Sequence, residues 1–185
     1  MKNNKKGASL LNYIIRQENS NDLQGIREVN IKAFENGENE ARLVDLVRNS
    51  EHFIPGLSLV AEKEDGEIIG HILFSTIHLV TISGTLPTLG LAPMAVKPGY
   101  QMEGIGSELV IAGLKACKAL GFKHVFVLGH PNFYPKFGFS PSKTFCIQSP
   151  FPVPDEVFMA IELQKGGLSG LQGKIVYPQA FSVVS

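Results

Sequence analysis

A glycine-rich turn in the middle of the chain has the residue types that can hold an anion. Gly104 and Gly106 stand one residue apart, after a strand-like stretch and before a stretch with helical periodicity. Free amides at a helix N-terminus point outward, and glycine lets a phosphate approach the backbone closely. Such a site needs no charged side chain, which suits a segment whose neighbouring cation is Lys97. The spacing predicts a phosphate-binding turn, and the alternative is a tight turn that only serves helix packing.

Two common phosphate-binding motifs do not match this turn. A dinucleotide-binding Gly-x-Gly-x-x-Gly motif needs a third glycine where the chain has Leu109. It also needs an acidic residue about twenty positions further on, where the chain has His124-Val125-Phe126. A P-loop needs Gly-Lys-Ser/Thr, which the sequence lacks. A nucleotide-binding protein is therefore the less favoured interpretation of the turn.

The elements that position this turn follow from hydrophobic patterning and turn residues. Strands are predicted over residues 11–17, 57–62, 67–79, 88–96, 124–128, 144–148, 157–163 and 175–177. Helices are predicted from capping residues 19–22 to residue 34, over residues 39–49 and over residues 104–120. This order predicts one α/β domain of residues 1–185, with residues 1–9 as a flexible tip and residues 164–185 as a C-terminal extension of the same domain.

The composition excludes several broad classes. The 185 residues are 44% apolar and carry 17 basic and 17 acidic side chains, so no general attraction to nucleic acid or to an anionic membrane is expected. No stretch reaches the roughly 18 apolar residues of a membrane span, and no signal-peptide cleavage site follows the N-terminus, so a cytoplasmic protein is expected. Cys117 and Cys146 have apolar neighbours and fit neither a disulfide framework nor a zinc site, so buried thiols and no metal are expected.

Five short motifs around the turn point to a known family. Before the turn stands Met94-Ala95-Val96, and the turn itself reads Gln101-Met102-Glu103-Gly104-Ile105-Gly106. Tyr134 precedes Gly138-Phe139 by four residues. In these elements residues 89–139 resemble the GNAT superfamily, the acyl-CoA-dependent N-acetyltransferases. Two further motifs are similar to those of a little-characterised bacterial branch, namely Val127-Leu128-Gly129-His130-Pro131 and Tyr177-Pro178-Gln179-Ala180-Phe181.

This resemblance implies a fold and a cofactor site. The implied fold is a twisted, mixed, mostly antiparallel sheet of about six or seven strands flanked by helices, with a V-shaped opening between the fourth and fifth strands. The turn would bind the pyrophosphate of acetyl-CoA through the backbone amides of Gln101, Met102, Glu103, Gly104, Ile105 and Gly106. The preceding strand would pair with the pantetheine arm and polarise the thioester carbonyl through Met94, Ala95 and Val96.

The resemblance also implies a reaction, the transfer of an acetyl group to a primary amine by direct attack on the thioester. Tyr134 would be the general acid that protonates the departing thiolate, and a packed aromatic residue is the alternative. The acceptor would be a small-molecule or peptide amine, and a homodimer is compatible with the family. A second class of function, an acyl-CoA-binding sensor or interaction module without catalysis, stays open.

Several titratable residues are candidates for other roles, each with an ordinary structural alternative. The base is not assigned among His130, His71, His78, Glu62 and Glu103, and the histidines 71 and 78 fall on opposite faces of one predicted strand. An acidic segment between the first two helices would face the acceptor amine through Glu35, Glu38 or Glu40. The other phosphate of the cofactor would meet Lys115, Lys118 or Lys123, for which solvated side chains are the favoured interpretation.

Overall fold

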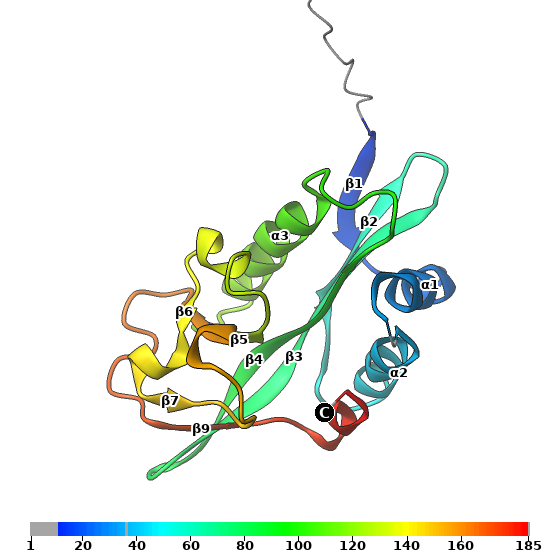
Figure 1. Ribbon diagram of the computed structural model, residues 1–185. Helices are drawn as coiled ribbons and strands as arrows, with labels where there is room; N and C mark the ends of the chain where they lie inside the picture. Colours follow the sequence, from blue (N-terminus) through cyan, green and yellow to red (C-terminus); the bar gives the residue numbers. More distant parts are fainter. Residues whose placement is uncertain (1–10, 36, 185) are drawn as a thin grey trace, which may run out of the picture.

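The computed structural model describes residues 11–35 and 37–184 (Figure 1). Within these ranges the strands are β1 (Tyr13–Gln17), β2 (Phe53–Lys63), β3 (Ile68–Thr81), β4 (Gly84–Val96), β5 (His124–Leu128), β6 (Ser140–Pro141), β7 (Ile147–Gln148), β8 (Phe158–Glu162) and β9 (Gly173–Val176). The α-helices are α1 (Leu23–Ala33), α2 (Gly37–Arg48) and α3 (Ile105–Ala119). Four short 3₁₀ helices follow, η1 (Tyr134–Phe137), η2 (Ser142–Phe145), η3 (Asp155–Val157) and η4 (Gln179–Val183). The predicted tip, residues 1–9, lies outside the described residues.

The strands form one mixed sheet with helices on both faces. Its order is β1-β2-β3-β4-β5-β8-β6, with β9 between β3 and β7. Neighbouring strands along this order run antiparallel except at β4–β5, and β7 pairs with β9 in parallel. Helix α3 covers one face, and helices α1 and α2 cover the other (Figure 1). The predicted α/β fold with a mostly antiparallel sheet is confirmed, although the described part holds nine strands because β6 and β7 have two residues each.

Each helix turns an apolar face to the sheet. The buried residues of α2 include Leu43, Val44 and Val47, and Val47 follows the other two by four and three positions, on the same side of the helix. Helix α3 approaches the sheet closely at Gly113, where a β-carbon would lie 2.2 Å from Cε2 of Phe74. No larger residue fits there, so glycine sets the distance between α3 and the strands.

The V-shaped opening arises from an irregularity in β4. Strands β4 and β5 pair only over three residues, Leu89–Leu91 with Val125–Val127. Directly after Leu91 the β3–β4 register shifts, because Ile72 pairs with Met94 whereas Phe74 pairs with Leu91. Two residues of β4 therefore oppose one residue of β3, which is a β-bulge, and such bulges bend the strand that carries them. Beyond the bulge, β4 continues to Val96 with its outer edge unpaired, which confirms the expected opening.

Two local expectations were wrong. Residues 144–148 do not form a strand, because η2 runs to Phe145 and only Ile147–Gln148 pairs with a neighbour. Cys146 is exposed rather than buried. It has a left-handed backbone conformation at the end of η2, and this turn directs Ile147 into the core and Cys146 outward. The apolar neighbours in sequence could not reveal this reversal.

The described residues contain neither a membrane-spanning helix nor a metal-binding cluster. No helix in residues 11–35 and 37–184 combines the length and apolar character that crossing a bilayer requires. The same part of the chain has no group of three or more histidine, cysteine, aspartate or glutamate side chains that could hold a metal ion.

Candidate active site

The glycine-rich turn becomes a cradle of free amides at the start of α3. Gly104 has a left-handed φ of 92° and precedes the helix, and a β-carbon there would meet no atom within 4 Å. The helical hydrogen bonds begin only with Ser107 and Glu108, whose amides donate to the Gly104 carbonyl. The amides of residues 101–106 donate no hydrogen bond to another described residue. Because they lie at a helix N-terminus, they can bind an anion.

The outer edge of β4 leads from this cradle into the opening. Lys97 donates its amide to the Ile69 carbonyl across the β3–β4 ladder. Alternate residues of a strand face the same neighbour, so Ala95 also faces β3, whereas Met94 and Val96 turn their backbone groups toward the opening. The Val96 carbonyl accepts a bond of 3.0 Å from Nε2 of Gln101, which agrees with this orientation. An extended ligand in the opening could therefore pair with β4 at Met94.

A groove of about 530 Å³ contains the cradle and this strand edge. Eight of the nine residues predicted from the sequence line it, namely Met94, Ala95, Val96, Gln101, Met102, Gly104, Ile105 and Gly106. The ninth, Glu103, is exposed and contributes no side chain to the groove. The structure thus brings the predicted segment together as one surface.

Lys136 is a groove residue that the sequence reasoning missed. Its Nζ lies 2.9 Å from Oγ of Ser107 in the first turn of α3, and 4.1 Å from the ring centre of Phe133. An ammonium at the rim of the cradle adds a positive charge beside the free amides. The three lysines suggested from the sequence, Lys115, Lys118 and Lys123, are exposed and do not line the groove. The sequence could not indicate this contact, because it forms only when η1 folds back toward α3.

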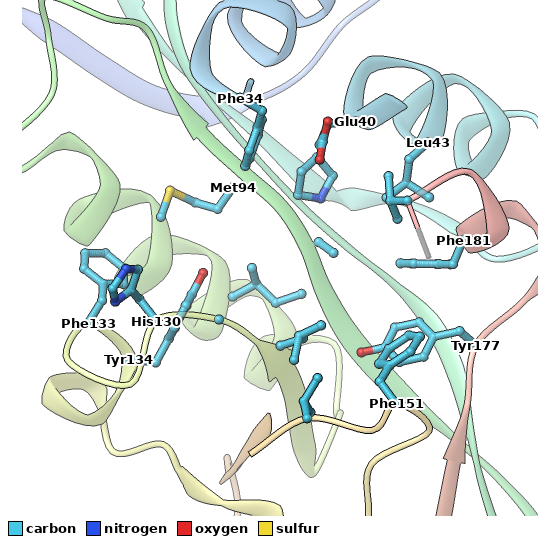
Figure 2. Close-up of a pocket in the computed structure, with 17 residues that line it drawn as sticks. Phe34, Glu40, Leu43, Met94, His130, Phe133, Tyr134, Phe151, Tyr177 and Phe181 are labelled. Carbon is cyan, nitrogen blue, oxygen red and sulfur yellow. The ribbon is translucent and has the colours of Figure 1, made fainter. Parts of the chain in front are cut away.

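A larger cavity of about 740 Å³ adjoins the groove on the side of β5 and the C-terminal segment. The two hollows share Phe34, Met94 and Phe133 in their linings. Tyr134 lines the cavity and directs its hydroxyl toward Met94 (Figure 2). Burial raises the pKa of Tyr134 to about 12. The hydroxyl is therefore a protonated donor beside the strand edge at any ordinary pH.

Only one of the candidate bases lies in the cavity. His130 lines it and is exposed, and its carbonyl accepts the amide of Phe133 at 3.0 Å. His78 lies outside the cavity lining, with its ring 5.8 Å from that of His52. Glu62 is paired with Arg16 at 2.7 Å, also outside the lining.

The three glutamates around the start of α2 point in different directions. Glu40 lines the cavity, and its Oε2 atom is buried without a hydrogen-bond partner among the described residues. Glu38 points elsewhere and pairs with Arg27 at 2.5 Å. Glu35 is exposed and does not contribute to the lining. Of the three glutamates suggested for the acceptor, only Glu40 reaches the cavity.

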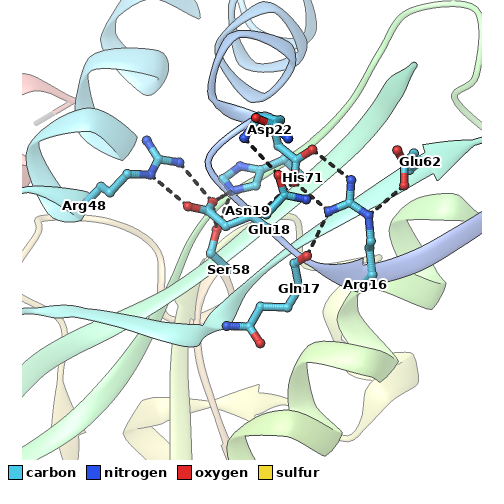
Figure 3. Close-up of polar contacts among 10 residues, drawn as sticks. Arg16, Gln17, Glu18, Asn19, Asp22, Arg48, Ser58, Glu62 and His71 are labelled. Carbon is cyan, nitrogen blue, oxygen red and sulfur yellow. Dashed lines mark hydrogen bonds and ion pairs between the residues drawn. The ribbon is translucent and has the colours of Figure 1, made fainter. Parts of the chain in front are cut away.

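His71 belongs to a buried polar network instead of the cavity (Figure 3). Its Nε2 lies 3.0 Å from Oγ of Ser58, and its Nδ1 lies 3.2 Å from Nδ2 of Asn30. Ser58 gives its single proton to Glu18, so His71 must donate through Nε2 and accept at Nδ1. Glu18 also receives two bonds from Arg48, at 2.9 and 3.0 Å. Burial lowers the pKa of His71 and keeps it neutral, in a structural role.

Comparisons with known proteins identify the family of the chain. The model of the Acetyltransferase (GNAT) family matches residues 23–139. The chain is 40% identical over 141 residues to the uncharacterized N-acetyltransferase YjhQ of Escherichia coli (strain K12), covering 73% of this chain and 74% of that protein. It is 32% identical over 170 residues to the uncharacterized N-acetyltransferase YhbS of the same strain, covering 91% of this chain and 98% of that protein.

Solved structures of this family share the fold. The GNAT family N-acetyltransferase YhbS from Escherichia coli, in complex with CoA, matches with a TM-score of 0.85 at 30% identity and covers 94% of each chain. A GNAT family acetyltransferase from Brucella melitensis, in complex with acetyl-CoA, matches with a TM-score of 0.74 at 29% identity and covers 93% of this chain and 99% of that one. The resemblance read from the sequence is confirmed, and the protein belongs to the GNAT family of acetyltransferases.

Proposed function

We propose that this protein transfers an acetyl group from acetyl-CoA to a primary amine by direct attack on the thioester. One observation carries the proposal: the amide cradle and the free edge of β4 line the groove, and the Tyr134 hydroxyl lies in the cavity that adjoins it at Met94. The YhbS and Brucella melitensis proteins, which share this fold, hold CoA and acetyl-CoA in their crystals.

The residues present fit such a donor. The amides of residues 101–106 have no other partner among the described residues and lie beside open space at Gly104, so they can donate hydrogen bonds to a pyrophosphate. Lys136 adds a charge at the rim of the same cradle. Met94 offers backbone groups toward the opening, which suits an extended amide-containing arm.

Bound acetyl-CoA supplies the activated acyl group as a thioester. The Met94 amide, on the free edge of β4, is placed to stabilise negative charge on a carbonyl oxygen in the opening. The Tyr134 hydroxyl keeps its proton at neutral pH because its pKa is about 12, and it donates that proton to the departing sulfur.

Calorimetric titration with acetyl-CoA tests the donor site. A β-carbon at Gly106 would meet only flexible side-chain atoms of Met94 and Val96, at 3.4 to 3.6 Å, so Gly106→Ala should bind like the parent protein. Gly106→Glu places a longer, negatively charged side chain on the groove floor and should weaken binding at least twentyfold. Absence of acetyl-CoA binding by the parent protein would refute the proposed function.

Tyr134→Phe separates catalysis from binding. It keeps the ring and removes the hydroxyl, so acetyl-CoA affinity should persist while kcat falls about a hundredfold. An unchanged kcat would remove Tyr134 from the mechanism. Binding of acetyl-CoA without transfer to any amine in a broad panel would favour the sensor or interaction module instead.

A further inference from the structure

The cavity has a second end that the donor does not need. Away from the residues shared with the groove, three aromatic side chains stand together, Phe151, Tyr177 and Phe181 (Figure 2). The ring centres of Phe151 and Tyr177 are 5.6 Å apart, and those of Tyr177 and Phe181 are 4.7 Å apart. We call these three residues the aromatic wall. Its flat apolar surface suits a ring or a short hydrocarbon chain.

The aromatic wall is held in place by the C-terminal segment. Strand β9 pairs with β3 through Lys174, Ile175 and Val176, directly before Tyr177. Helix η4, which contains Phe181, then lies against α2 (Figure 1). The wall therefore rests on the sheet and a helix, so its shape is preorganised for a ligand.

The cavity lining has few groups that can carry a charge. Among the described lining residues, Glu40 and His130 are the titratable groups besides the two tyrosines, and no lysine or arginine is present. Glu40 lies between the Met94 end and the aromatic wall, with its carboxylate directed into the cavity (Figure 2). A ligand with a carboxylate or phosphate would find no fixed cation here, and its desolvation would oppose binding.

The buried oxygen of Glu40 is the second observation. Its Oε2 atom has no hydrogen-bond partner among the described residues although it is shielded from water. A buried carboxylate oxygen without a partner is unfavourable. A rotation of the Glu40 side chain into the cavity would let an ammonium group of a ligand satisfy it with a charge-assisted hydrogen bond. The aromatic rings nearby also favour a cation.

We propose that the acceptor is a primary amine on an apolar body of about the size of one aromatic ring, without an acidic group. Its ammonium is bound by Glu40, and its apolar body packs on the aromatic wall. This inference rests on the proposed function, since it assigns the substrate class of the same site. The position of Glu40 between the wall and Met94 places the amine near the strand edge where the thioester would lie.

The first test is calorimetry on the protein saturated with CoA, with three probes. We expect 2-phenylethylamine to bind at least twentyfold more tightly than phenylalanine, which adds a carboxylate, and more tightly than ethanolamine, which lacks the ring. Glu40→Gln should weaken 2-phenylethylamine binding at least tenfold but leave 2-phenylethanol binding unchanged, because that probe carries no charge. Glu38→Gln is the matched control, since it removes the same charge from the same helix outside the cavity.

A second variant tests the aromatic wall, and acetylation assays distinguish this inference from the proposed function. Phe181→Leu keeps an apolar residue but removes a ring, and it should weaken 2-phenylethylamine more than ethanolamine. Equal binding of all three amines, or no effect of Glu40→Gln, would overturn this inference. So would preferred acetylation of phenylalanine, spermidine or ethanolamine, an outcome that leaves the proposed function standing. Failure to bind acetyl-CoA would overturn both, and circular dichroism of each variant confirms that it is folded.

Discussion

Gly129 makes room for the ring of Tyr134, because a β-carbon on Gly129 would lie 2.2 Å from Cε2 of that ring. Both residues line the cavity, and Gly129 is fixed by its amide, which donates to the Val157 carbonyl at 2.8 Å. The direction of the Tyr134 hydroxyl thus depends on the absence of a side chain at Gly129, five residues earlier in the chain.

Gly129→Ala should displace this ring and lower kcat more than tenfold, since a shift of about 1 Å in a catalytic group can reduce a rate by two orders of magnitude. Acetyl-CoA affinity should change little, because Gly129 does not line the groove. Steady-state kinetics and calorimetry measure the two effects. Gly56→Ala is the control, since a β-carbon there would meet only Cδ1 of Leu120 at an ordinary 3.5 Å. An unaltered kcat in Gly129→Ala would show that the ring position is not critical.

The pH dependence of kcat should reflect the burial of the Tyr134 hydroxyl, which raises its pKa. Burial raises its pKa to about 12, so the protonated form required for donation persists as pH rises. We expect kcat to increase between pH 6 and 10 as the bound amine loses its proton, with no descending limb. Measurements with a saturating amine check this. A descending limb with a midpoint near pH 10 would mean that solvent reaches the hydroxyl.

Lys136→Gln should raise the Kd for acetyl-CoA about fivefold, because it removes an exposed charge at the rim of the cradle. The difference between parent and variant should shrink as salt is added, since exposed charges are screened. Lys118→Gln serves as the control, because Lys118 is also exposed but does not line the groove. If titrations at low and high salt gave both variants the same Kd for acetyl-CoA, Lys136 would have no role in the cradle.

Glu18→Gln should lower the free energy of unfolding by about 3 kcal/mol, because it leaves Arg48 without its buried partner. Burial alone would raise the pKa of Glu18, but hydrogen bonds with His71, Arg48 and Ser58 outweigh it and lower the pKa to about 2. A carboxylate with a lowered pKa stabilises the fold above its unfolded value of 4.5, and this stabilisation is lost as pH falls toward 2.

Urea unfolding of parent and variant at several pH values measures this loss. The difference between the two curves should be full at pH 7 and should disappear between pH 4.5 and pH 2. The exposed pair of Lys143 and Asp155 gives the control, and Asp155→Asn should change stability by less than about 1 kcal/mol. A constant difference across the acid range would exclude the carboxylate as its source.

The donor half of the site could be predicted from the sequence because it is local. Strand β5 has the predicted bounds, His124–Leu128, since a short apolar run with β-branched residues has few other ways to fold. Helix α3 begins one residue after the predicted start, because two glycines mark its N-terminus. The amide cradle follows directly from these two elements.

The acceptor half could not be predicted in the same way, because its residues meet only through tertiary contacts. Phe151 and Glu40 come from segments far apart in the sequence, and neither segment indicates that the two residues line the same cavity. Tyr177 and Phe181 belong to a motif that is visible in the sequence, but the position of their segment beside α2 depends on the pairing of β9 with β3. The strand predicted over residues 144–148 was wrong, because the apolar pattern of this segment suits a strand and a 3₁₀ turn equally well.

The separate origin of the two halves has an evolutionary consequence. The groove is built mainly from the stretch between Met94 and Ser107, whereas the aromatic wall comes mainly from the segment after β9. Substitutions in that last segment can alter which amine enters while the donor site keeps its sequence and shape. Homologous chains can therefore diverge in acceptor choice without rebuilding the machinery that activates the acyl group.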